Sequence, residues 1–559
     1  MAKIIFYIVL LEILKINGLV NGNFDWSRYI KSNSLVIYYT KLTSLNGIEI
    51  YKNLTSIGIS FNRIDDIQNI KNLISLTEIN FFENKIKDIS MIGNLINLKI
   101  INFSFNRIEI ISVLENLINL EQLFLTGNKI KKLNSFKKLL NLKRVDISRN
   151  QLDCIDNIFD AVSLEDLDAG LNWIKNVDRI IHLNKLEYLQ LEYNKIDSVK
   201  SVCKLKKLVK LTMSYNKIID IECIFQNYSE IKLIQLDHNY INGCIFLNNL
   251  PNIQRLELDN NQISEFKVNK SNTYNKLTSL KLMNNRLKEL ASIESFINLE
   301  FLFLSFNQID NIEYLKNLKS LSYLCLNNNK IFNIKSLVNL TKLYYLDLEN
   351  NKLSNIDSLI SLRNLQHLKL SDNKILDSSV LKYLNKLEKL YLKGIEINST
   401  NYLKNMTSLI HLDLSFTNLM EIEFAINCLS IKTLLVNNNR IEDFSNLAKL
   451  NNLEVLDISF NFKDKTVYDS FSYDLTKLKK IFIDKRQLMM FFNLINLNFK
   501  KKKADIVFLD SINIIIKSNT EFINCSLILY FIKRNIHFNL YNDIQVFNFL
   551  KKCQNIISL

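Results

Sequence analysis

The chain has 559 residues, of which 48% are hydrophobic and 23% charged, with 9 Gly, 1 Pro and a formal net charge of +15. This composition excludes a wholly disordered chain, a collagen and a string of modules joined by Pro-rich linkers. A conventional fold of this length would divide into three or four domains, whereas a repeat array grows in one dimension, so an internal repeat is the first pattern to test.

The first segment, residues 1–31, is signal-like or capping. An apolar stretch over 4–11 follows one lysine, and small or neutral residues surround Asn21, so residues 1–22 resemble a secretory signal peptide. Glu12 and Lys15 interrupt the apolar run, which is therefore too short and too charged to span a bilayer. The alternative is a helix that caps the exposed end of a repeat array. Both interpretations stay open.

Residues 32–488 repeat with a period of 22, in the pattern L-x-x-L-x-L-x-x-N-x-I/L-x-x-I-x-x-L-x-x-L. Two of the intervals are longer, at 23 residues after Asn216 and 24 residues after Asn261. Thr40, Ile395 and Thr417 occupy the Asn position in three of twenty copies. The other copies have Asn62, Asn84, Asn106, Asn128, Asn150, Asn172, Asn194, Asn216, Asn239, Asn261, Asn285, Asn307, Asn329, Asn351, Asn373, Asn439 and Asn461.

Each part of the unit predicts a structure. Before Asn128, Leu123 and Leu125 alternate with polar residues, which predicts a short strand with one buried face. After it, apolar residues recur at every third position, which favours 3₁₀ turns or extended coil over an α-helix. The recurrent Asn predicts a buried side chain whose amide satisfies backbone groups at the end of the strand. One unit cannot bury its own apolar face, so the units must stack.

This pattern resembles the leucine-rich repeat proteins, in particular the 22-residue class of internalin-like and phosphatase-regulator-like solenoids. The resemblance implies an α/β-type solenoid, a right-handed horseshoe or arc of about twenty repeats with a concave parallel β-sheet and convex 3₁₀ or coil segments. The excess of Asn, Ile, Lys, Tyr and Phe indicates an AT-rich coding genome. Together with the repeat it is similar to the leucine-rich repeat gene family of entomopoxviruses, which would make this a viral protein, and a protist or an AT-rich bacterium fits almost as well.

Three irregularities interrupt the repeats. The two longer intervals lengthen the connections after Asn216 and Asn261. The loss of Asn at Ile395 and Thr417 predicts a weaker turn ladder there, unless both changes reflect drift in a tolerant repeat. Residues 489–559 lose the period and are basic, with Lys500 to Lys503 in one run, and we expect them to form a capping segment over the last coil.

The cysteines bear on the compartment. All eight are scattered singly, which favours buried or incidental thiols and a cytoplasmic protein, whereas residues 1–22 favour secretion. Cys203, Cys223 and Cys244 lie on consecutive coils, but each has a different offset from its Asn, so a bridge is possible and not indicated.

Signals of chemistry are nearly absent. The sequence has no Cys-x-x-Cys, His-Glu-x-x-His, Gly-x-Ser-x-Gly or glycine-rich phosphate loop, so we expect no enzyme, cofactor or metal site. Cys325 and His367 are predicted to face the concave side two strands apart, roughly 10 Å, which is too far for a nucleophile and its base. We interpret both as surface polar residues.

The repeat phase predicts which side chains point out of the inner sheet: those six, four and two residues before each Asn. We name two sets of candidate partner-binding residues. The acidic strip contains Asp166, Asp168, Tyr188, Glu192, Asp237, Glu257 and Asp259. The aromatic strip contains Phe301, Phe303, Tyr323, Tyr345, Asp347, Glu349 and Tyr391.

Aromatic side chains are favoured interface anchors, and solenoids generally bind partners on their concave face. The sequence therefore predicts a non-catalytic scaffold that binds a protein on this face, with no transmembrane span. Nucleic acid is a less favoured partner, because no basic groove or base-stacking motif accompanies the +15 charge. The alternatives are a secreted or surface adhesion protein that acts in host interaction, and a regulatory adaptor subunit of a phosphatase or ubiquitin ligase.

Overall fold

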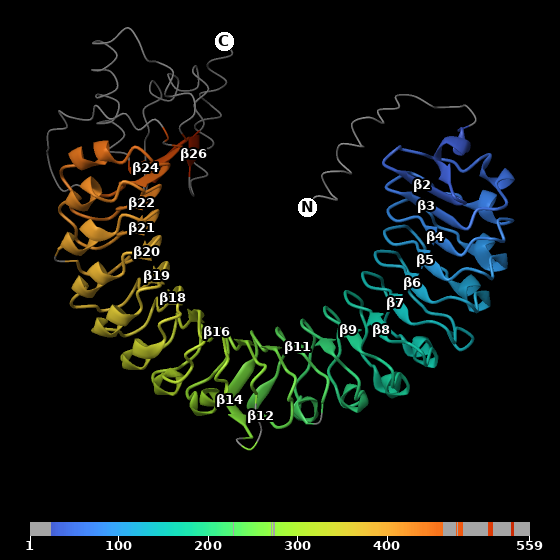
Figure 1. Ribbon diagram of the computed structural model, residues 1–559, viewed down its shortest axis with the longest axis horizontal. Coiled ribbons are helices and arrows are strands. Elements are labelled where there is room, and N and C mark those ends of the chain that lie inside the picture. Colours follow the sequence, from blue (N-terminus) through green and yellow to red (C-terminus); the bar gives the residue numbers. More distant parts are fainter. Residues whose placement is uncertain are drawn as a thin grey trace, which may run out of the picture. The chain divides into compact units, whose positions relative to one another are not determined.

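The computed structural model describes residues 24–461 except 227, 270, 272, 273 and 398, together with 477, 479–484, 513–517 and 538–540. The chain divides into two compact units, Met1–Leu277 and Thr278–Leu559. The boundary lies within the predicted solenoid of residues 32–488, inside the 24-residue interval that follows Asn261. Within each unit, strands line the concave side and 3₁₀ helices line the convex side (Figure 1).

The first unit begins with a short cap. The 3₁₀ helix η1 (Trp26–Tyr29) buries Trp26, whose indole Nε1 donates a hydrogen bond of 2.9 Å to the carbonyl of Asn46. Strand β1 (Ile30–Lys31) then pairs with β2 (Ser34–Tyr38) in antiparallel orientation. Residues 24–31 therefore cover the first coil, and the signal-like residues 1–22 lie outside the described residues.

From β2 onward, successive strands of the first unit pair in parallel, and each strand aligns residue for residue with the strand one repeat later. The remaining strands of this sheet are β3 (Ser56–Ser60), β4 (Glu78–Asn80), β5 (Ile100–Asn102), β6 (Gln122–Phe124), β7 (Arg144–Asp146), β8 (Asp166–Asp168), β9 (Tyr188–Gln190), β10 (Lys210–Thr212), β11 (Leu233–Gln235) and β13 (Arg255–Glu257).

The convex side of the first unit confirms the prediction from the three-residue spacing. Ile108, Ile111, Leu114 and Leu117 are fully buried, and a 3₁₀ helix forms around the third of them. The 3₁₀ helices are η2 (Ile48–Ile50), η3 (Gln68–Ile70), η4 (Ser90–Asn94), η5 (Ser112–Asn116), η6 (Asp156–Asp160), η7 (Asp178–His182), η8 (Val202–Lys204) and η9 (Glu222–Phe225).

The second unit repeats this plan. Its parallel strands are β15 (Ser279–Lys281), β16 (Phe301–Phe303), β17 (Tyr323–Cys325), β18 (Tyr345–Asp347), β19 (His367–Lys369), β20 (Lys389–Tyr391), β21 (His411–Asp413), β22 (Thr433–Leu435) and β23 (Val455–Asp457). Its 3₁₀ helices are η10 (Ala291–Ser295), η11 (Glu313–Leu315), η12 (Lys335–Asn339), η13 (Asp357–Ser361), η14 (Ser379–Tyr383), η15 (Asn401–Asn405), η16 (Glu423–Ile426) and η17 (Ser445–Lys449).

Three further strands extend the sheet of the second unit: β24 (Lys480–Asp484), β25 (Asn513–Lys517) and β26 (Phe538–Leu540), which pair in parallel and in order. Two of these strands belong to the segment 489–559 that the sequence assigns to a cap, so the parallel sheet continues into that segment. Lys500 to Lys503 lie outside the described residues.

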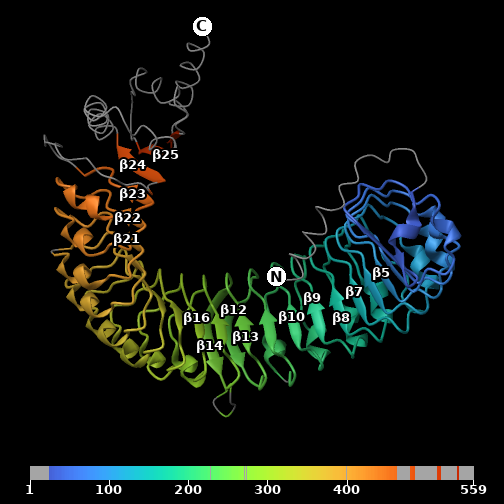
Figure 2. The same cartoon turned by 45° about the horizontal axis from the view of Figure 1, so that its top comes forward.

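The two longer intervals produce a feature that the sequence reasoning missed. Strands β12 (Asn242–Leu247) and β14 (Gln262–Val268) form a separate two-stranded parallel sheet in the first unit, with a bulge opposite Gly243 and Cys244. This sheet lies on the convex side, where neighbouring coils have 3₁₀ helices (Figure 2).

The expectation of unpaired thiols is wrong for two cysteines. Cys203 and Cys223 form a disulfide, with their Cα atoms 5.8 Å apart. Their different offsets do not prevent pairing, because a separation of 20 residues still places them on adjacent coils within the reach of a bridge. Of the other cysteines in the described residues, Cys154 and Cys244 are exposed thiols and Cys325 and Cys428 are buried thiols.

In the part of the chain that the structure describes, no helix has the length and apolar character needed to cross a membrane.

Candidate partner-binding surface

A ladder of asparagine side chains fixes the end of each strand, and therefore the direction of the side chains on the concave face. In a typical copy, Asn106 Oδ1 accepts a 3.0 Å hydrogen bond from the backbone N–H of Ile86, in the preceding coil. Asn106 Nδ2 donates to the carbonyls of Phe81, at 2.8 Å, and Phe103, at 3.0 Å. Each such amide thus satisfies backbone groups of two coils that would otherwise be buried without partners.

The residue immediately before each ladder position has a left-handed backbone. Its φ lies between 50° and 75° in all twenty copies, and only Gly127 and Gly394 are glycines. This conformation costs free energy for a residue with a Cβ atom, and the asparagine hydrogen bonds on either side hold it in place.

Two of the three copies without asparagine keep part of the ladder. Thr417 N and Oγ1 both donate to Asn439 Oδ1, and Oγ1 lies 2.6 Å from the carbonyl of Leu414. Thr40 makes the same two contacts with Asn62 Oδ1. Ile395 is buried and supplies no side-chain hydrogen bond, yet β20 and β21 keep their register.

The acidic strip lies in the first unit, on β8, β9, β13 and the turns that follow β9, β11 and β13. On β8, Asp166 and Asp168 flank the fully buried Leu167. Arg144 Nε lies 3.0 Å from Asp166 Oδ2, and Lys210 Nζ lies 2.6 Å from Gln190 Oε1.

The sequence reasoning missed these basic residues, although Arg144, Lys210 and Arg255 occupy the position six residues before their ladder Asn. Thr212 Oγ1 also donates a 2.9 Å hydrogen bond to Glu192 Oε2, and Gln235 Nε2 donates a 2.8 Å bond to Glu257 Oε2. Acids of the strip are therefore linked to basic and neutral partners across neighbouring strands.

Asp168 is the most perturbed acid of this strip. Its pKa is raised to about 7, mainly by burial; the carboxylates of Asp146, Glu192 and Asp166 also raise it, and a 3.0 Å hydrogen bond from the N–H of Gly170 opposes the rise. Burial also raises the pKa of Asp166, although the guanidinium of Arg144 opposes this shift. Charge on Asp168 is thus suppressed near neutral pH.

The aromatic strip lies in the second unit, on β16, β17, β18, β20 and the turn after β18. The rings of Tyr323 and Tyr345 stack with centroids 4.0 Å apart and planes 6° apart. The ring centroids of Phe303 and Tyr323 are 5.1 Å apart, and those of His367 and Tyr345 are 5.7 Å apart. Adjacent strands thus form a continuous row of half-buried rings.

A polar pair lies among these rings. Lys369 Nζ is 3.3 Å from Asp347 Oδ2, and it also lies over the rings of Tyr345 and Tyr391, at 6.0 and 5.5 Å from their centroids. Burial raises the pKa values of Asp347 and Glu349. The pKa of Lys369 is raised because these two carboxylates outweigh its burial. Lys369 therefore connects Asp347 to both tyrosine rings.

The interpretation of Cys325 as a surface polar residue is wrong. Cys325 is on the concave side of β17, but it is only 7% exposed, and burial raises the pKa of its thiol to about 12. The position in the repeat predicts the direction of a side chain but not the size of its neighbours, which are here Phe303 on β16 and Asp347 on β18.

Two further aromatic rows follow the strand ends of the first unit. Tyr193, Tyr215 and His238 stack with successive centroid distances of 4.1 and 4.0 Å. A second row consists of Tyr39, Phe61, Phe82 and Phe105. Six of these seven residues directly precede a ladder position, so the repeat phase contained the signal, although the sequence reasoning considered only earlier positions.

No group of three or more His, Cys, Asp or Glu side chains is placed to hold a metal ion within the described residues. Cys325 and His367 lie on β17 and β19, with β18 between them.

Comparison with solved structures supports the assignment of the fold. A leucine-rich repeat protein of Leptospira interrogans is 28% identical over 65% of this chain and 95% of its own, with a TM-score of 0.58. YopM from Yersinia enterocolitica is 20% identical over 79% of this chain and 96% of its own, with a TM-score of 0.57. The plant peptide hormone receptor RGFR1, solved in complex with RGF2, is 19% identical over 91% of this chain and 95% of its own, with a TM-score of 0.65.

No family model matches the sequence, and no curated protein matches it. The assignment therefore depends on the repeat, the strand and 3₁₀ pattern and the structural neighbours. Each of the twenty copies has its strand on the concave side, and seventeen of them have the asparagine turn, with Thr40, Ile395 and Thr417 in the other three. The chain is a leucine-rich repeat protein.

Proposed function

We propose that this protein is a non-catalytic scaffold that binds a protein partner on its concave face, with the aromatic strip of the second unit as the main anchor. Proteins of this fold generally serve as binding scaffolds or receptors, and the plant peptide hormone receptor named above was solved in complex with RGF2. The partner contacts the rings of Tyr323 and Tyr345 and the carboxylate of Glu349.

The observation that carries the proposal is the stack of Tyr323 on Tyr345 beside the Asp347–Lys369 pair. Side chains that are ordered before binding lose little conformational entropy when a partner arrives. Rings that are half-buried in the free protein still offer apolar area, and tyrosine is among the residues most enriched at the energetic centres of interfaces. The strip therefore supplies a pre-organised anchor.

The experiment compares affinity purifications followed by mass spectrometry. The variant combines Tyr323→Ala, Tyr345→Ala and Glu349→Ala, and we expect it to recover partners of the wild-type protein at least about tenfold less well. The matched control is Phe332→Ala, because Phe332 is an exposed aromatic residue three positions after Asn329 and off the concave strands. Equal recovery by the triple variant and the wild-type protein would reject this placement of the site.

A further inference from the structure

The convex sheet of the first unit has an open edge. Strand β12 pairs with β14, and the carbonyls of Ile241 and Leu247 accept hydrogen bonds from the backbone N–H groups of Gln262 and Asn269. Backbone groups of successive residues in a strand point to opposite edges, so those of Asn242, Cys244 and Phe246 point away from β14. Among the described residues, these groups have no backbone partner on that edge.

The open edge is bounded at both ends by contacts with the preceding coil. Before it, Tyr240 N–H donates to the carbonyl of Ile218, and after it, the N–H groups of Asn248 and Asn249 both donate to the carbonyl of Phe225. Between these points no backbone hydrogen bond joins β12 to the preceding coil, although β12 and η9 remain in contact. A strand has replaced the usual 3₁₀ helix here, and an unpaired strand edge is a ready template for another extended chain.

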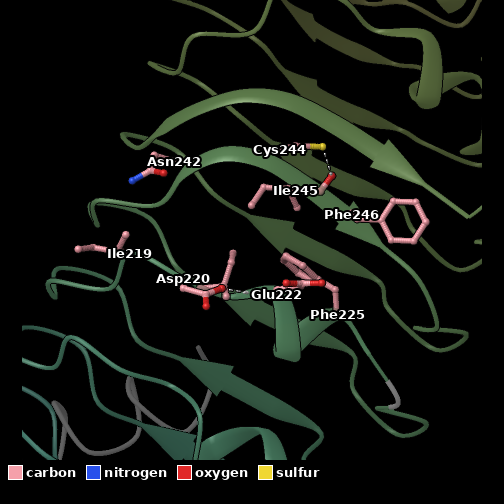
Figure 3. Close-up of a pocket in the computed structure, with 9 residues that line it drawn as sticks. Ile219, Asp220, Glu222, Phe225, Asn242, Cys244, Ile245 and Phe246 are labelled. Atoms are coloured by element: carbon pink, nitrogen blue, oxygen red, sulfur yellow. Dashed lines mark hydrogen bonds between the residues drawn. The ribbon is translucent and has the colours of Figure 1, made fainter.

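A pocket of about 390 Å³ occupies this gap (Figure 3). Asn242, Cys244, Ile245 and Phe246 of β12 form one wall, and residues 219–222 with Phe225 form the other. Ile219 and Phe246 are exposed apolar side chains at its rim. The pocket therefore joins unpaired backbone groups to apolar surface, which is the combination that strand addition requires.

The wall opposite β12 is acidic. Asp220 and Glu222 are both exposed, and the N–H of Glu222 donates a 3.0 Å hydrogen bond to Asp220 Oδ1. Neither carboxylate forms an ion pair with a basic side chain in the described part of the chain. A lysine or arginine of an incoming chain would complement these charges.

The acidic wall is also cross-linked. Cys223 belongs to η9 and forms its disulfide with Cys203 of η8, so the segment that faces β12 is covalently tied to the coil before it. An opening that exists before binding costs less to occupy than one that must form.

We propose that the edge of β12 is a second docking site, which takes a short extended peptide segment of a partner protein. The segment pairs through its backbone with Asn242, Cys244 and Phe246 and places a lysine or arginine side chain against Asp220 and Glu222. This site is on the convex side and does not depend on the function proposed for the concave face.

A proline variant tests the backbone pairing. Cys244→Pro removes the N–H that faces the pocket and leaves the pairing with β14, because a strand tolerates proline where its N–H points away from the ladder. The control is Cys244→Ser, which keeps the N–H. A displayed library of random peptides of about eight residues, long enough to span β12, is selected on the full chain carrying Cys244→Ser.

We expect selected peptides to be rich in β-branched residues and to carry at least one lysine or arginine. Their affinity should fall by about tenfold on Cys244→Pro and by several-fold on Asp220→Asn with Glu222→Gln. The proposal is overturned if peptides bind the two Cys244 variants equally well, if selection yields no binder, or if the binders lack basic residues.

A second measurement requires no change to the protein. N-methylation of alternate amides of a selected peptide removes the donors on one of its edges, and we expect one phase of methylation to abolish binding and the other to preserve it. Equal loss in both phases would contradict strand addition. Analytical ultracentrifugation tests whether the occupant is instead a second copy of this chain. If Cys244→Ser forms a dimer and Cys244→Pro does not, the proposed occupant is overturned.

Discussion

Two ion pairs show how the concave strips of the two units differ. In the first unit, Arg144 lies 3.0 Å from Asp166, and the side chain of Asp166 is 23% exposed. In the second unit, Lys369 lies 3.3 Å from Asp347, and that carboxylate is only 6% exposed among tyrosine rings. Arg144 and Asp166 lie six residues before their ladder Asn, whereas Asp347 and Lys369 lie four residues before theirs. The first unit thus has a more exposed ion pair, and the second has a more covered pair within an aromatic row.

The two ion pairs differ because of the side chains around them, since each pair joins one acidic and one basic residue. In the first unit, Asp166 pairs with Arg144, whose side chain is 55% exposed to water. In the second unit, the stacked rings of Tyr323 and Tyr345 lie beside a pair whose side chains are less exposed, at 29% for Lys369 and 6% for Asp347. Interactions that are shielded from water are stronger and cost more when one partner is removed. The following predictions test this contrast, from the largest expected effect to the smallest.

Asp168→Asn tests the one acid of the first strip that is strongly perturbed by burial. The folded-state pKa of about 7 is above the ordinary value of 3.8, so folding favours the protonated form. Stability should therefore fall as pH rises from about 4 to about 7, by an amount on the order of 4 kcal/mol. The Asn variant should lose this dependence and exceed the wild-type protein in stability at pH 8, as measured by thermal unfolding across pH.

The matched control for this experiment is Asp153→Asn, which changes an exposed carboxylate outside the strip. It should leave the pH profile of unfolding unchanged. A wild-type profile that is flat between pH 4 and 7 would show that water reaches Asp168 as freely as an ordinary surface acid.

Asp347→Ala tests the covered pair of the second unit. The change leaves the Lys369 ammonium without its nearest carboxylate and removes the acceptor of the Glu349 N–H, so it should destabilise the unit by about 2–3 kcal/mol. Urea unfolding followed by circular dichroism measures the effect. Asp166→Ala, in the first strip, should cost less than about 1 kcal/mol, and equal costs would remove the contrast between the strips.

Tyr345→Leu tests the aromatic row itself. Leucine retains apolar volume but loses the stack with Tyr323 and the contact with Lys369, so stability should fall by about 1 kcal/mol. The measurement is hydrogen exchange of the backbone amides of β17 and β18, which should quicken. Unchanged exchange would mean that the rings contribute nothing beyond their burial.

Salt gives the smallest effect. A double-mutant cycle on Arg144 and Asp166 should yield a coupling below about 1 kcal/mol at low ionic strength, and most of it should vanish in about 0.5 M salt. The corresponding cycle on Lys369 and Asp347 should change less, because that pair is covered. A salt response of equal size in both cycles would count against the proposed shielding.

Much of this architecture was predictable from the sequence, because a residue pattern that recurs in many copies stands out from chance matches in any single copy. The spacing of Ile108, Ile111 and Leu114 predicts the 3₁₀ segment, and Asn106 predicts the hydrogen-bonded turn. The directions of Asp166 and Tyr323 follow from their distance to the ladder.

Structural features that occur in only one copy of the repeat could not be predicted from the repeat pattern. The burial of Cys325 depends on the size of adjacent residues, and the Cys203–Cys223 bridge depends on how two coils of different phase overlap. The convex sheet depends on alternation in Asn242–Leu247 and Gln262–Val268, which a three-residue period conceals. The partner-binding role of either strip stays a prediction.

The asparagine ladder also gives the array a direction of growth. Each asparagine reaches back, since Asn106 bonds backbone groups of Ile86 and Phe81 in the coil before it. Each coil that folds therefore completes the hydrogen bonds of the turn in the coil before it. The hydrogen bonds of its own turn are completed only when the next coil folds. Because a ribosome releases the chain from its amino end, the order of synthesis matches the order in which these turns are completed.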